Sequence, residues 1–147
     1  MFENYTESAR RSIFFARYEA SQFGGRSIEV GHLLLGLSRE SRWLFSQAAT
    51  IDPAAALRPA LEALCPRSAD RVPTSADLPL SDSCARALLY ADQEAERMRH
   101  RQISPEHLLL GVLVENGPEA QALGNLGINL EKTRSDVLRS LGSTGPV

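Results

Sequence analysis

The chain has 147 residues, of which 43% are hydrophobic, and a formal net charge of −2. This length fits one compact domain spanning residues 1–147, and the weakly acidic charge gives no general attraction for nucleic acid or an anionic membrane. No apolar run approaches the roughly 18 residues of a membrane span, and the N-terminus lacks a secretory signal, so we expect a cytoplasmic protein that binds neither.

The sequence contains an internal duplication. Residues 6–37 and 81–112 match without a gap at a constant offset of 75 positions. The clearest match is the pentapeptide His-Leu-Leu-Leu-Gly, which occupies residues 32–36 and again residues 107–111. A match of this length indicates that one small helical unit was duplicated and that both copies kept the same packing positions.

The duplication divides the chain into two repeats. Repeat one covers about residues 1–65, repeat two covers about residues 80–142, and the polar, proline-containing residues 66–79 form a predicted surface linker. Because a unit of roughly 70 residues buries little surface by itself, we expect the two repeats to share one hydrophobic core.

Each repeat opens with a predicted long amphipathic helix. Thr6 and Ser81 precede these helices and suit the N-cap position, because a hydroxyl oxygen can accept a hydrogen bond from a first-turn amide. Apolar residues follow at steps of three and four, as on the buried face of a helix. These residues are Ala9, Ile13, Ala16, Ala20 and Phe23 in repeat one, and Cys84, Leu88, Ala91, Ala95 and Met98 in repeat two.

A turn and a short apolar helix come next in each repeat. Residues 104–106, Ser-Pro-Glu, form a strong helix start, with a cap, a proline at the first position and an early acid. Residues 29–31, Glu-Val-Gly, form a weaker start at the matched place in repeat one. We expect His32 and His107, at matched positions in these helices, to tie each helix to the neighbouring turn.

Two further helices are predicted in each repeat. The third covers residues 41–49 in repeat one and 118–125 in repeat two. The fourth begins at Pro53 in repeat one, with Asp52 as its cap, and covers residues 130–141 in repeat two. No strand pattern appears, so we predict an all-α fold of eight helices arranged as two tandem four-helix repeats.

The sequence lacks the motifs of common catalytic sites. It has no phosphate-binding glycine loop, no nucleophile elbow and no zinc-protease motif. Two cysteines and three histidines do not follow metal-ligand spacing. The matched residues Glu19 and Glu94 fit a solvated helix face or local ion pairs. We therefore expect a protein that is not an enzyme and that needs neither a metal nor another cofactor.

Several segments resemble one known family, the Clp repeat domain. This is the N-terminal domain of the Clp/Hsp100 ATP-dependent unfoldases, and the chain is most similar to the ClpC type. The segments that carry the resemblance are residues 1–3, 6–10, 28–37, 80–81, 103–113 and 119–128. The resemblance implies a pseudo-two-fold bundle of eight helices, in agreement with the elements predicted above.

The resemblance also implies a function. In the family, this domain sits on a ring of AAA+ ATPase subunits and captures substrates and adaptor proteins for unfolding and degradation. We therefore expect a non-catalytic protein-binding module with protein substrates, adaptors and a Clp unfoldase as partners, either as an N-domain or as a standalone Clp-repeat protein. The alternative is a sensor that binds phosphoarginine-like tags or cyclic peptides.

In ClpC-type domains each repeat can hold a phosphorylated arginine of a substrate. The glutamate before the family histidine pairs with the guanidinium group, and the hydroxyl residue at the start of the long helix helps to hold the phosphate. Carried over, these positions are Ser81 and Glu106 in repeat two, whereas repeat one has Thr6 but Gly31 in place of the glutamate. We expect at most one complete site, in repeat two. The alternative is that Ser81 and Glu106 only stabilise helix starts.

Two other positions differ from the family pattern. Some members bind cyclic-peptide antibiotics in an apolar groove flanked by a phenylalanine near the start of each repeat; Phe2 matches the first, and Leu80 replaces the second. Trp43 stands where the family has a small, glycine-bearing segment. It fits either a core residue or an anchor for a partner, since tryptophan is common among residues that dominate binding energy.

Overall fold

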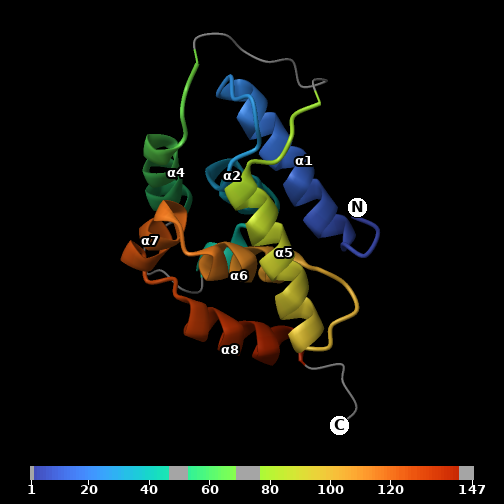
Figure 1. Cartoon of the computed structure of the whole chain (residues 1–147). Helices are drawn as coiled ribbons and strands as arrows, with labels where there is room; N and C mark the ends of the chain where they lie inside the picture. Colours follow the sequence, from blue (N-terminus) through green and yellow to red (C-terminus); the bar gives the residue numbers. More distant parts are fainter. Residues whose placement is uncertain (1, 47–52, 69–76, 143–147) are drawn as a thin grey trace.

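The computed structural model describes residues 2–46, 53–68 and 77–142, and these residues form eight α-helices and no β-strand (Figure 1). The helices are α1 (Glu7–Gln22), α2 (Val30–Glu40), α3 (Trp43–Ser46), α4 (Pro53–Leu64), α5 (Asp82–Arg97), α6 (Pro105–Glu115), α7 (Pro118–Asn125) and α8 (Leu130–Leu141). The predicted all-α fold is confirmed, and α7 and α8 have the bounds expected from the sequence.

The third helix of repeat one differs from the prediction. It begins at Trp43 rather than Ser41, because Ser41 closes α2: its N–H donates to the Leu37 carbonyl at 2.7 Å. The rest of the predicted helix, residues 47–49, and the predicted cap Asp52 lie outside the described residues.

In each repeat the long helix packs closely against the apolar helix that follows it, at a glycine. A Cβ atom on Gly36 of α2 would lie 2.4 Å from the Ser12 carbonyl oxygen and 2.6 Å from the Ala16 nitrogen of α1. A Cβ atom on Gly111 of α6 would lie 2.1 Å from the Ala87 carbonyl oxygen of α5. These atoms are backbone atoms that cannot turn away, so only glycine permits the contact.

A buried ion pair joins the fourth helix of each repeat to the first. The Glu94 side chain of α5 is almost fully buried and accepts from Arg134 of α8 at 2.8 and 3.0 Å. The Glu19 side chain of α1, also buried, accepts from Arg58 of α4 at 2.9 Å. Of the two interpretations of these matched glutamates, the ion pair is confirmed and the solvated face is wrong.

The two repeats exchange short segments. The chain that precedes α1 pairs with the turn before α6, where the Thr6 N–H donates to the Ile103 carbonyl at 3.0 Å. The chain that precedes α5 pairs with the turn before α2, where the Ser81 N–H donates to the Ile28 carbonyl at 3.0 Å. The residues of these two contacts match each other at the 75-residue offset of the sequence repeat. Each repeat therefore supplies the segment that pairs with the turn of the other repeat.

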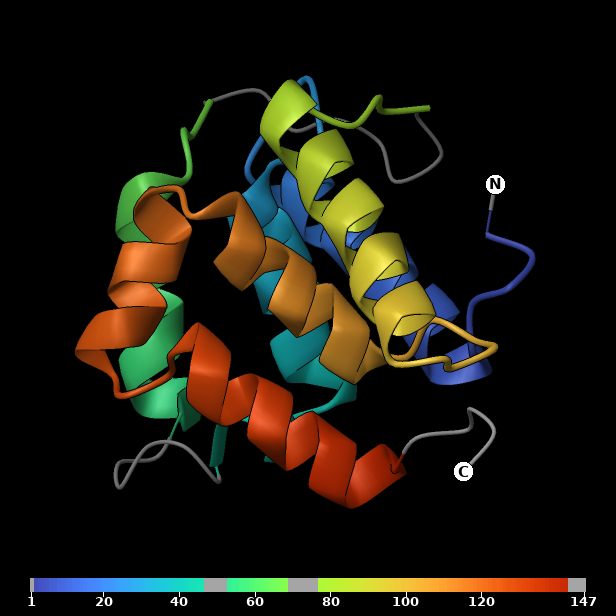
Figure 2. The same cartoon turned by 60° about the horizontal axis from the view of Figure 1, so that its bottom comes forward.

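The remaining helices close the core between the repeats. Figure 2 shows α6 between α5 and α8, with α7 lying beside α4 of the other repeat. The apolar stripes of α1 and α5 belong to the core, with Ile13 only partly buried. Two residues of the predicted linker contact the rest of the molecule. The Ser68 N–H donates to the Phe23 carbonyl at 2.8 Å, and the partly buried Leu78 packs against the core.

The contact at Gly111 predicts a large difference between two glycine substitutions. Gly111→Ala should lower the free energy of unfolding by about 1–3 kcal/mol, because the methyl group overpacks two backbones. Gly124→Ala on α7 meets nothing within 4 Å and should raise it by about 0.5–1 kcal/mol through helix propensity. Urea unfolding followed by circular dichroism measures both. Equal stabilities of the two variants would contradict the close contact.

Candidate functional site

The start of each apolar helix is held by a histidine. In α6 the His107 Nδ1 atom accepts from the backbone N–H of the N-cap residue Ser104 at 2.9 Å. In α2 the His32 Nδ1 atom accepts from the N–H of the N-cap residue Glu29 at 3.0 Å. The expected role of both histidines, tying the helix to the neighbouring turn, is confirmed.

The hydrogen bonds extend further in repeat two. Because its Nδ1 accepts, neutral His107 carries its proton on Nε2 and donates it to His100 Nδ1 at 2.7 Å. His100 in turn donates from Nε2 to the Gly142 carbonyl at the end of α8. Repeat one has Gly25 at the position of His100, and the buried Nε2 of His32 has no hydrogen-bond partner among the described residues.

Glu106 lies in the first turn of α6, beside this histidine chain. Its side chain is buried, with the residue 6% exposed, and no hydrogen bond or salt bridge joins it to the described residues. It lines a small cavity between α3, α6 and α8, with Trp43, Leu44, Leu109, Thr133, Asp136, Val137 and Ser140. The positive end of the α6 dipole favours a negative charge at this position.

The cavity is small and has an aromatic rim. Its volume of about 40 Å³ has room for a few water molecules. The Trp43 residue in its lining is 46% exposed, so this side chain is not a core residue.

The two predicted hydroxyl residues, Thr6 and Ser81, lie at the starts of the long helices α1 and α5. Thr6 and Ser81 are both N-caps, accepting at 3.1 Å from the N–H groups of Ala9 and Cys84 respectively. The exchange between the repeats places Thr6 against the turn that leads into Glu106, and Ser81 against the turn before α2. The hydroxyl residue at the start of α6 itself is the N-cap Ser104, and neither Thr6 nor Ser81 lines the cavity at Glu106.

At the matched position in repeat one, a side chain fills the space. A Cβ atom on Gly31 would lie 2.4 Å from the sulfur of Cys65, at the end of α4. Cys65 and Cys84 are buried free thiols, and burial raises the pKa of each to about 12, so both act as small apolar side chains. Any side chain at position 31 would require the Cys65 side chain to move.

Phe2 and Leu80 lie in different surroundings. Phe2 lines a groove of about 230 Å³, together with Asn4, Tyr5, Ala85, Leu88, Leu89, Asp92 and Ile103. Leu80 is not in that lining; it packs partly buried against the core next to Ile28. The two residues that would flank a cyclic-peptide groove therefore do not line this groove together.

The described part of the chain has neither a cluster of metal ligands nor a membrane-spanning helix. No three histidine, cysteine or acidic side chains there gather in an arrangement that could hold a metal ion. None of the described helices is both long enough and apolar enough to cross a bilayer. Glu106 and its surroundings are thus the strongest candidate site.

Comparisons with known proteins agree on one family. The family model of the Clp repeat N-terminal domain matches residues 4–126 and again residues 82–147. The chain is 32% identical over 146 residues to the Bacillus subtilis "Negative regulator of genetic competence ClpC/MecB", covering 97% of this chain and 18% of that protein. It is 32% identical over 153 residues to an "ATP-dependent Clp protease ATP-binding subunit ClpA homolog" of Cyanidium caldarium, covering 100% of this chain and 17% of that protein.

Solved structures give the same result. The crystal structure of the N-terminal domain of the chaperone ClpD from Arabidopsis thaliana superposes with a TM-score of 0.75 at 29% identity, covering 96% of each chain. The Hsp104 N-terminal domain from Candida albicans superposes with a TM-score of 0.76 at 16% identity, covering 97% of this chain and 94% of that one; this likeness concerns the fold alone. The chain spans less than a fifth of the length of the ClpC and ClpA relatives that it matches.

The buried histidines predict a stability that decreases in acid. Burial, and for His107 also the nearby His100, lowers the pKa of His32 and of His107 from 6.5 to about 4. Between these values the unfolded chain binds protons that the folded chain does not, so stability falls as the pH decreases through this window. The loss at pH 5 should be about 2 kcal/mol per histidine.

Urea unfolding at pH 7 and pH 5 measures this effect. The double variant His32→Asn, His107→Asn keeps an acceptor oxygen near each N-cap but does not titrate, so it should lose much less stability over the same interval. An unchanged pH dependence in the double variant would show that other groups cause it.

Proposed function

The chain belongs to the family of Clp repeat N-terminal domains, and we propose that it is a non-catalytic module that captures protein substrates or adaptors for a Clp ATP-dependent unfoldase. Its relatives are ATP-binding subunits and chaperones of the Clp system, of which the chain matches only a small part. The fold supports a binding role, because two packed four-helix repeats present helix ends and hollows between helices without a cluster of catalytic side chains in the described residues.

The observation that carries this proposal is Glu106 in the first turn of α6, where it lines the cavity between α3, α6 and α8. The positive end of the helix dipole at this N-terminus favours a phosphate group. A carboxylate matches the planar fork of a guanidinium group. A phosphorylated arginine side chain carries both groups, so Glu106 and the α6 N-terminus suit its two ends.

Two further residues support this choice of ligand. The Thr6 N–H donates to the carbonyl of Ile103, three residues before Glu106, and we assign the Thr6 hydroxyl group to the phosphate end of the ligand. The half-exposed Trp43 ring at the cavity rim can lie over a guanidinium group in a cation–π contact. The groove beside Phe2 gives the cyclic-peptide alternative less support, because Leu80 does not line it.

Calorimetric titration with free phosphoarginine tests this function. The wild-type chain should bind, and Glu106→Gln should abolish binding, because the amide lacks the negative charge that the guanidinium needs. Thr6→Ala should weaken binding about tenfold by removing one charge-assisted hydrogen bond.

Ser81→Ala is the matched control. It removes an N-cap hydroxyl with the same geometry, at the same expected cost of about 1 kcal/mol in stability, but from the other end of the molecule. It should bind as the wild type does. Equal weakening by Thr6→Ala and Ser81→Ala would contradict the assignment of Thr6, and failure of the wild type to bind would exclude the phosphoarginine site.

A further inference from the structure

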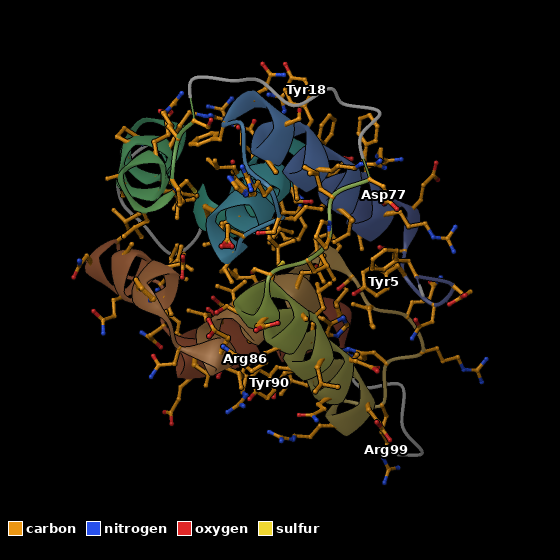
Figure 3. The ribbon with its side chains drawn as sticks, turned by 45° about the horizontal axis from the view of Figure 1, so that its top comes forward. Tyr5, Tyr18, Asp77, Arg86, Tyr90 and Arg99 are labelled. Carbon is orange, nitrogen blue, oxygen red and sulfur yellow. The ribbon has the colours of Figure 1, made fainter. Side chains whose placement is uncertain are left out.

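Repeat one carries a second hollow, on the face formed by α1, α2 and the end of α4. Its volume is about 370 Å³. We name it the arginine hollow, and its lining residues are Tyr18, Glu19, Gln22, Phe23, Arg39, Arg58 and Arg67. Figure 3 shows Tyr18 at the outer end of α1, well separated from Arg86 on α5. None of the lining residues belongs to the cavity at Glu106.

The guanidinium groups of the arginine hollow are held in place by rings and by one buried carboxylate. The Arg67 Cζ atom lies 4.3 Å from the centroid of the Phe23 ring. The Arg39 Cζ atom lies 5.2 Å from the centroid of the Tyr18 ring, and the Arg58 Nη2 atom lies 2.9 Å from a Glu19 oxygen. Side chains fixed in this way lose less entropy when a ligand binds.

The arginine hollow has an excess of positive charge. Three arginines line it against one carboxylate, that of Glu19, which Arg39 also contacts at 3.3 Å. Outside the lining, Glu62 pairs with Arg67 at 3.2 Å and with Arg58 at 3.6 Å. The three arginine side chains remain 38–60% exposed, and each has five N–H donors, so donors are left for an anionic ligand.

The matched surface of repeat two shows what the fold alone requires. The residues there at the positions of Tyr18 and Arg39 are Gln93 and Val114, whereas Arg134 makes the ion pair that Arg58 makes in repeat one. The buried Glu94 is still held, by Arg134 and Arg97. Among the described residues, the cation–π contacts that fix an arginine over a ring all lie in repeat one. Arg67 and the rings of Phe23 and Tyr18 are therefore not required to hold the buried Glu19.

We propose that the arginine hollow docks an acidic peptide segment of a partner protein. Guanidinium groups from three elements are spread around one hollow, so they suit several carboxylates in succession rather than a single ion. Arginine and tyrosine are also enriched among the residues that dominate protein interfaces. This surface goes beyond the proposed function, because it is separate from the Glu106 cavity and holds a different chemical group.

Fluorescence anisotropy with a labelled oligoglutamate peptide at low ionic strength tests the proposal. The wild-type chain should bind it, and added salt should weaken binding. Arg39→Gln and Arg67→Gln should each weaken binding roughly tenfold, as expected for the loss of one charge-assisted contact. The control Arg86→Gln makes the same change in net charge at an exposed site on α5 and should bind like the wild type. Thermal unfolding confirms that each variant is folded.

Four outcomes would overturn the proposal. They are no binding of oligoglutamate, equal weakening by Arg86→Gln and Arg39→Gln, equally tight binding of an oligothymidine strand, and loss of oligoglutamate binding in Glu106→Gln. The second would indicate general charge attraction, the third a preference for any polyanion, and the fourth a single site at Glu106. Glu106→Gln should leave oligoglutamate binding unchanged, so failure of the phosphoarginine site and failure of the arginine hollow are distinguishable.

Discussion

The structure depends on the close approach of two helices at a glycine, made once in each repeat. Gly36 and Gly111 let the apolar helices α2 and α6 lie directly on the backbones of α1 and α5. This contact fixes where the apolar helices begin, and therefore where His32 and His107 meet the turns before them. It also leaves the N-terminus of α6 next to the chain that precedes α1. The candidate site is thus placed by backbone packing, with Glu106 in the first turn of a helix that lies against α5 at Gly111.

The sequence predicted the helices well and the site less well. Duplication and apolar spacing identified the long helices, their caps and the role of the histidines, because these features are local. The contact of the Thr6 backbone with the turn before α6 was not predicted, since the order of the repeats along the chain does not show that they exchange segments. The burial of Glu19 was also missed, because its arginine partner comes from a helix about forty positions away.

The two repeats have kept the same fold while their surfaces have become different. Repeat two has Glu106 and the chain of hydrogen bonds from His107 to Gly142. Repeat one has Gly31 with Cys65 packed against it, and carries Arg39 where repeat two has Val114. The contact glycines and the histidines that hold the apolar helices are the same in both repeats, whereas residues at helix starts and outer faces differ. One duplicated unit can in this way present two chemically distinct surfaces.

The exchange of segments between the repeats affects how the chain folds during synthesis. Contacts that complete repeat one join Ile28 to residues that precede α5, and contacts that complete repeat two join its turn to the first residues of the chain. A ribosome adds about 5–20 residues per second, so the turn of repeat one waits several seconds for its partner. The order of folding is therefore set by the arrival of the second repeat, and an isolated repeat lacks the segment that closes its own turn.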